Sequence, residues 1–185
     1  MNRELIKIDI SVNALVERKV IDNLLEINSY TQQHGLVMTE TIAKEIAEAR
    51  QAALRDYGRV DFSSDTTARL VKAFSQSYYI TQETFSEIIG EIIELFYFIK
   101  NELGNTLSDD DLISEMLIVF NETCFGTVEV MQSKGVEKII RKHKLGDTKI
   151  WDDYEKDRIV FGVDDVWHDY ESLEDKLKYG ENWRE

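Results

Sequence analysis

The sequence contains no proline, although average usage of about 5% would place roughly nine in a chain of 185 residues. Proline interrupts helices because it lacks a backbone N–H and its ring crowds the preceding turn. Its absence is compatible with a series of helices joined by turns that glycine marks. The absence does not by itself require a helical fold.

Cysteine and long apolar runs are also scarce. The single cysteine, Cys124, excludes an intramolecular disulfide and fits a reducing compartment. No run approaches the roughly 20 apolar residues that a membrane helix needs. The N-terminal MNRELIKIDI lacks the apolar stretch of a signal peptide. We therefore expect a cytoplasmic protein.

Positive charge is the third shortage, since the formal net charge is −14. Such a surface repels nucleic-acid phosphates and anionic membranes, and favours a basic partner or simply solubility. Residues 147–185 carry 13 acidic and 6 basic residues, and also hold all three tryptophans. We therefore divide the chain into a helical bundle domain, 1–146, and an acidic, tryptophan-rich C-terminal extension, 147–185.

The most informative stretch is Ile80–Gly104, which predicts a central helix over about 81–103. Thr81 is suited to the N-cap, and Gly104 to the left-handed position that ends a helix. Gly90 indicates a close backbone contact, and Phe98 falls among the glutamates, where a loop or a partner must cover it. The broad apolar face comprises Phe85, Ile88, Ile89, Ile92, Leu95, Phe96, Ile99 and Leu103.

The rest of the chain predicts an all-α fold, a compact bundle of about six to eight amphipathic helices around that central helix. Residues 1–11 predict a short strand or a frayed start. The first helix turns inward Leu15, Val16, Val20, Leu24 and Ile27. Helices are predicted at 12–33, 39–57, from Ser64, from Ser108 to Cys124, at 127–133, and at 136–144 after a break at Gly135. The tail predicts a short α/β-like segment, with a strand at 158–163 and a helix ending near Tyr179.

Four stretches of the chain carry a resemblance to a known family: NSYTQQHGLVMT at 28–39, EARQAALRDYGRVDF at 48–62, YITQETFSEII with ELFYFIKNE at 79–102, and CFGTVEVM at 124–131. On these stretches, residues 28–143 resemble an uncharacterised bacterial family of small acidic helical proteins, a domain of unknown function. SYYI at 77–80 departs from it, since a proline is expected in that turn. The acidic tail lies outside the resemblance, which implies a helical fold and no known activity.

Carboxylates and nucleophiles offer few candidates for chemistry. Glu83, Glu87, Glu91 and Glu94 share one helix face, but the Glu-x-x-His motifs of di-iron bundles are missing, so we expect a solvated face. Cys124 lies on an apolar stripe and predicts a buried, inert thiol. Neither GxGxxG nor a P-loop occurs. We therefore expect no catalytic, cofactor-binding or metal-binding residues and no cofactor.

The histidines and the basic run at 141–144 also have structural explanations. Asp164, Asp165, His168 and Asp169 have metal-ligand chemistry, yet a helix N-cap with acidic first-turn residues explains them better. His143 is in register with apolar positions and is expected to be half-buried. RKHK at 141–144 ends a helix, and we expect its charges to complement the helix dipole and not to contact nucleic acid.

Aromatic residues in the tail give the sharpest functional signal. Tryptophan and tyrosine are enriched at binding hot spots, and an acidic amphipathic helix can dock into a basic-rimmed groove. The alternative is that these rings pack on the bundle's own surface. The candidate partner-binding residues are Trp151, Tyr154, Trp167, Tyr170, Trp183 and Phe98.

The leading hypothesis is a non-enzymatic protein-binding module, a small subunit or adaptor whose partner has a basic surface. The first alternative is an acidic inhibitor that mimics nucleic acid and occupies a phosphate-binding cleft. The second is a carboxylate metal-dependent enzyme. A homo-oligomer is a further expectation left open, with Phe98 and Gly90 marking its seam.

Overall fold

The computed structural model describes residues 2–61, 65–104 and 106–145, with side chains for 14–61, 65–104 and 106–144. These residues form helices and turns and no strand, which confirms the all-α prediction. The helices are α1 (Asn2–Glu26), α2 (Asn28–Thr31), α3 (Glu40–Asp56), α4 (Asp65–Phe74), α5 (Phe85–Glu102), α6 (Asp109–Ile118), α7 (Val128–Val130) and α8 (Val136–Leu145). A 3₁₀ turn (Gln32–His34) follows α2, and π-helical turns follow α6 (Val119–Thr123) and α7 (Met131–Gly135).

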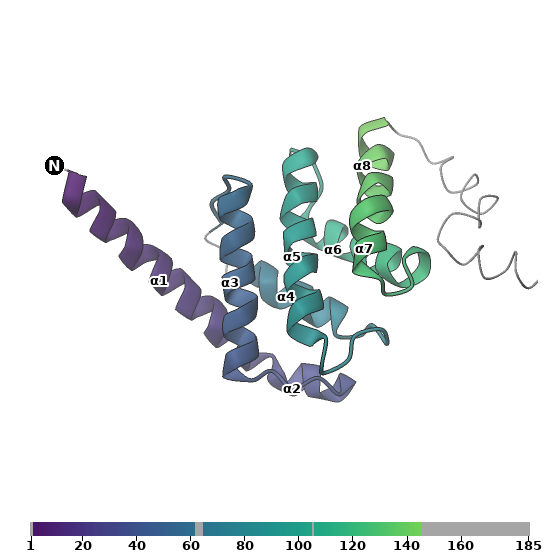
Figure 1. Cartoon of the computed structure of the whole chain (residues 1–185), viewed down its shortest axis with the longest axis horizontal. Coiled ribbons are helices and arrows are strands. Elements are labelled where there is room, and N and C mark those ends of the chain that lie inside the picture. The colour runs from purple at the N-terminus through teal and green to yellow at the C-terminus, as the bar shows by residue number, and fades with distance from the viewer. Residues whose placement is uncertain (1, 62–64, 105, 146–185) are drawn as a thin grey trace, which may run out of the picture. The chain divides into compact units, whose positions relative to one another are not determined.

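The central helix of the bundle is α5, as the sequence predicts, and it packs on α3, α4, α6 and α7. Its neighbour α3 runs alongside it (Figure 1). A Cβ on Gly90 would lie 3.3 Å from the Cβ of Ala49 in α3, so glycine lets the two backbones approach closely. The predicted close contact is therefore confirmed, between α5 and α3.

Local capping explains where several helices begin. The Thr39 hydroxyl accepts a hydrogen bond from Ile42 N at 3.2 Å, and the Ser108 hydroxyl accepts one from Asp111 N at 3.1 Å. Both hydroxyls cap helices whose starts the sequence predicts, and they satisfy donors that the first helical turn leaves free. The prediction for α5 was wrong by one turn. Thr84 N donates to Thr81 O at 3.2 Å, so these residues form a separate turn and the helix begins at Phe85.

The N-terminal region differs from its prediction in three ways. Residues 2–11 are helical, not a strand, and the helix ends at Glu26 instead of continuing to Gln33. Ile27 interrupts the helix, with φ −83° and ψ 1°, and α2 and the 3₁₀ turn then carry the chain to His34. The Asn28 side chain accepts a hydrogen bond from Met38 N at 2.8 Å and so holds the returning chain. Leu15 is 67% exposed, not inward, because α1 runs away from α3 towards its N-terminus (Figure 1).

The predicted break at Gly135 is also wrong. The π-helical turn that ends at Gly135 passes directly into α8. A Cβ at this position would lie 2.5 Å from Met131 Sδ and 3.2 Å from Cys124 Sγ. Glycine is therefore needed for close packing inside a continuous helical segment, and not for a turn.

The C-terminal extension falls beyond the described part of the chain. The strand at 158–163, the helix ending near Tyr179 and the boundary after residue 146 stay predictions.

Candidate interaction surface

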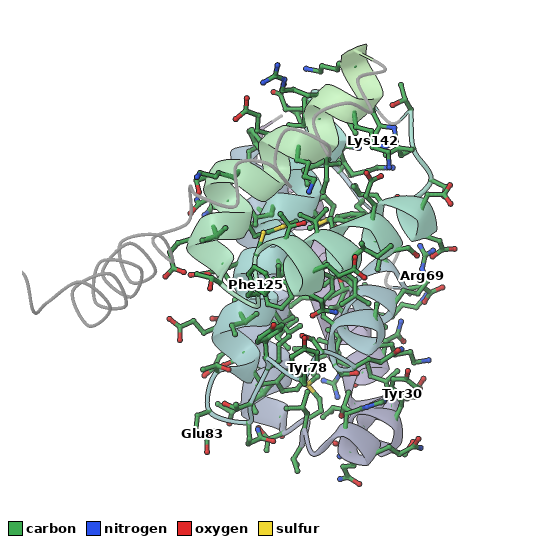
Figure 2. All side chains as sticks on the ribbon, turned by 90° about the vertical axis from the view of Figure 1, so that its right-hand side faces the viewer. Tyr30, Arg69, Tyr78, Glu83, Phe125 and Lys142 are labelled. Carbon is green, nitrogen blue, oxygen red and sulfur yellow. The ribbon has the colours of Figure 1, made fainter. Side chains whose placement is uncertain are left out.

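Two exposed rings lie in turns that are distant in sequence and that contact one another through Gly126 and Tyr79. Tyr78, between α4 and α5, is 77% exposed, and Phe125, between α6 and α7, is 60% exposed. The ring of Tyr79 stacks on Tyr78 with centroids 4.2 Å apart, and the Tyr78 hydroxyl donates to the Tyr79 hydroxyl at 3.2 Å. We call Tyr78, Tyr79 and Phe125 the aromatic patch; Figure 2 labels Tyr78 and Phe125.

The aromatic patch rests on a fixed base. The backbone of Gly126 lies against Tyr79, since an added Cβ would be 2.2 Å from Tyr79 Cβ. Gly126 N donates to Phe120 O at 2.9 Å, and the Tyr79 ring meets Phe120 edge-on at 6.5 Å. Beneath the two turns, the Ser77 hydroxyl donates to Asn121 Oδ1 at 2.6 Å. These contacts hold the turn that carries Phe125 against the loop that carries the tyrosines.

The backbone of Phe125 adopts a left-handed conformation, with φ +49°. This conformation costs an ordinary L-residue roughly 1–2 kcal/mol, whereas glycine adopts it freely. The side chain recovers little of that cost by burial, because most of it faces solvent. A large apolar residue at a strained, exposed position suggests a contact with another molecule.

A line of carboxylates runs along α5 and the segments next to it. Glu83, Glu87, Glu91 and Glu94 are exposed, as the sequence predicts, and α7 adds Glu129, which is also exposed. The pKa of Glu91 is raised by partial burial and then by the charges of Glu129, Glu87 and Glu94. Hydrogen bonds from its own backbone N–H and from Thr81 lower the pKa of Glu83. We call these five residues the carboxylate row.

Phe98 lies among those glutamates and is half-buried. The ring of Tyr57, at the end of α3, packs against it with centroids 5.8 Å apart and a 58° tilt. Tyr57 has a raised pKa, caused first by burial and then by the Glu94 charge. One side of Phe98 is therefore covered by its own chain. The other five predicted partner-binding residues lie outside the described residues, and their role stays a prediction.

The cysteine and one lysine occupy the interior beneath the two π-helical turns. Cys124 is buried, its Sγ lies 3.9 Å from Met131 Sδ, and burial raises its pKa to about 12. The predicted buried thiol is confirmed. Lys138, which the sequence did not single out, is also buried and donates to the Thr123 hydroxyl at 3.1 Å. Burial lowers the pKa of its ammonium group to about 8.

The basic run at 141–144 contacts carboxylates of its own chain. Glu115 of α6 binds Lys142 Nζ and His143 Nε2, both at 2.7 Å. Lys144 pairs with Glu102 of α5 at 2.9 Å. His143 is partly buried, as predicted, and the run does lie in the last turn of α8. Its charges also tie α8 to two neighbouring helices, which sequence spacing alone did not indicate.

Within 2–61, 65–104 and 106–145, no group of three or more His, Cys, Asp or Glu residues is placed to hold a metal ion. Asp164, Asp165, His168 and Asp169 lie outside these ranges. In this part of the chain, no helix combines the length and apolarity required to cross a membrane.

A protein-family model described as a family of unknown function matches residues 23–149, which is more than half of the chain. The chain belongs to this family, DUF6323. The predicted resemblance is thereby confirmed, with a match that begins late in α1 and ends just beyond α8. No curated protein and no solved structure matches the chain.

The DUF6323 match contains both the aromatic patch and the carboxylate row, whereas the aromatic residues Trp151 to Trp183 lie beyond its end. Sequence analysis missed Tyr78 and Phe125. The only signals were the adjacent tyrosines in SYYI and the Phe-Gly pair in CFGT, where a turn residue precedes glycine. The surface that the DUF6323 region presents is therefore different from the one that the tail suggested.

Proposed function

We propose that this DUF6323 chain is a non-enzymatic protein-binding module that acts as a small subunit or adaptor. The observation that carries the proposal is the aromatic patch, with Tyr78 and Phe125 exposed on a fixed base. Tyrosine is enriched among interface hot spots, and phenylalanine among the core residues of interfaces. Rigid rings lose little conformational entropy on binding, so a patch held in place by hydrogen bonds is suited to recognition.

The backbone at Phe125 adds a second line of support. A residue that served only the fold at this left-handed position would be glycine or asparagine, since both avoid most of the strain. Phenylalanine there places an apolar side chain in solvent and lowers stability. A binding role accounts for that choice, because complex formation buries the ring.

The C-terminal extension supplies a further candidate element of the same function. Its tryptophans and tyrosines, Trp151 to Trp183, are set in an acidic segment of net charge −7, which follows from 13 acidic and 6 basic residues. The extension and the aromatic patch make separate predictions, because each can be altered without changing the other.

The experiment is affinity capture from a lysate of the native cell, with mass spectrometry and the full-length chain as bait. One bait carries Phe125→Asn and Tyr78→Ser, which remove the exposed rings while asparagine tolerates the backbone at 125. The matched control carries Val60→Ser at another exposed apolar position, 77% exposed.

The proposal predicts a protein that the wild type and the Val60→Ser control capture equally, and that the double variant loses. Substituting Trp151, Trp167 and Trp183 together tests the extension in the same way. Capture that no set of substitutions changes, or no captured protein at all, would contradict the proposal.

A further inference from the structure

We propose that the aromatic patch and the carboxylate row form one binding face for a basic segment of a partner protein. In this arrangement an apolar anchor of the partner packs on Phe125 and Tyr78, and its lysine or arginine side chains contact Glu87, Glu91 and Glu129. This inference rests on the proposed function and specifies the partner's chemistry.

Short stretches of chain connect the two groups. Phe125 immediately precedes Gly126, which lies against Tyr79, and four residues later the same segment brings Glu129 of α7 beside Glu91 of α5. At the other end of the patch, the chain from Tyr79 leads into Glu83 just before α5 begins. Figure 2 shows Phe125, Tyr78 and Glu83 in one view of the bundle.

The charges around this face are complementary to a basic segment. Arg69 and Lys142 appear in the same view, but Arg69 pairs with Asp109 at 3.3 Å and with Asp110, and Lys142 pairs with Glu115 at 2.7 Å. No ion pair within residues 14–61, 65–104 and 106–144 joins a cation to Glu87, Glu91 or Glu129. These carboxylates therefore remain able to bind an incoming lysine or arginine.

Both parts of the face lower the stability of the free protein. Phe125 is strained and exposed, and desolvation together with the neighbouring carboxylates raises the pKa of Glu91. Positions where local rules are broken without compensation inside the fold are expected at functional sites. A basic segment with an apolar anchor would relieve both penalties, by burying the ring and neutralising the carboxylates.

The test selects peptides from a displayed library of random 12-residue sequences on the full-length protein at physiological salt. The selected peptides are expected to combine lysine or arginine with aromatic or aliphatic residues. Their dissociation constants are then measured by fluorescence anisotropy against four forms of the full-length chain. The forms are wild type, Phe125→Asn/Tyr78→Ser, Glu87→Gln/Glu129→Gln, and the charge-matched control Asp22→Asn/Glu26→Gln on α1.

The inference predicts that both face variants bind about tenfold more weakly, which is a loss of about 1.4 kcal/mol, and that the control binds like the wild type. Selection of acidic or uncharged peptides, or no selection, would overturn it. Loss only in the carboxylate variant would also overturn it and favour the nucleic-acid mimic, which needs charge alone. Equal loss in the α1 control would show nonspecific attraction to the acidic chain. If the peptide test fails but the aromatic patch is needed for capture of a protein from the lysate, the inference about a basic segment is wrong and the proposed function is retained.

Discussion

Replacing Phe125 separately by glycine and by alanine measures the strain that places its ring on the surface. Both substitutions remove the ring, but only glycine removes the Cβ that makes the left-handed backbone unfavourable. Relief of that conformation contributes roughly 1–2 kcal/mol. The greater entropy of glycine in the unfolded chain offsets about 0.4–1 kcal/mol. We therefore expect Phe125→Gly to be more stable than Phe125→Ala by about 0.5–1 kcal/mol.

Ile118 provides the matched control, because it is 48% exposed but has an ordinary helical backbone, with φ −60° and ψ −49°. There the order should reverse, with Ile118→Gly less stable than Ile118→Ala by about 1 kcal/mol. Urea denaturation followed by circular dichroism gives each free energy of unfolding, and a difference of 1 kcal/mol corresponds to about 2–4 °C in Tm. If glycine is the less stable substitution at both positions, Phe125 is not strained and the reasoning fails.

Three further predictions concern the surroundings of the same face. Gly126→Ala should destabilise the fold by about 2–5 kcal/mol, because the added Cβ would collide with Tyr79. The control Gly35→Ala, at a left-handed position with open space, should lose only about 1–2 kcal/mol. Equal losses of stability in thermal denaturation would rule out the collision. Glu91→Gln should raise Tm at pH 7 and not at pH 3, since a raised carboxyl pKa means that the ionised form opposes folding; a loss of stability at pH 7 would contradict this. The pKa of Lys138 falls to about 8 in the fold from 10.5, so the unfolded chain binds more protons between these values and stability should rise with pH there. The free energy of unfolding of the wild type, relative to that of Lys138→Met, should therefore increase between pH 7.5 and 9. A constant difference in urea midpoints between the two proteins would count against the burial of this amine.

Features encoded within one helix were predictable from the sequence. The apolar stripes of α3, α5 and α6 repeat with the helical period, and Thr39 and Ser108 bind backbone groups only three residues away. The left-handed backbone at Gly104, φ +59°, likewise ends α5 where the pattern predicts. These features depend on neighbours within one or two turns, so tertiary contacts do not change them.

Features that depend on distant segments were missed or wrong. Leu15 continues an apolar stripe, but its exposure depends on where α1 leaves α3. One side of Phe98 is covered by Tyr57, which caps the end of another helix. The carboxylate row was recognised on α5, yet Glu129 joins it only because α7 packs there. Such contacts arise from the arrangement of helices, which periodicity does not specify.

The aromatic patch was the least predictable feature of all. Its two turns are far apart in the chain, and they meet through Gly126 and Tyr79. Phe125 adopts a backbone conformation contrary to its own preference, so local propensity argues against the observed turn. A site built from residues that violate local rules can be found only once the fold is known.

The most direct test of the central claim compares a selected 12-residue peptide binding to the wild type and to Phe125→Asn, with Val60→Ser as control. Fluorescence anisotropy gives each dissociation constant, and circular dichroism checks that all three forms have the same helix content. The account predicts weakening of about tenfold for Phe125→Asn and no change for Val60→Ser. Equal affinity for all three forms would show that the exposed ring at Phe125 is not part of a binding surface.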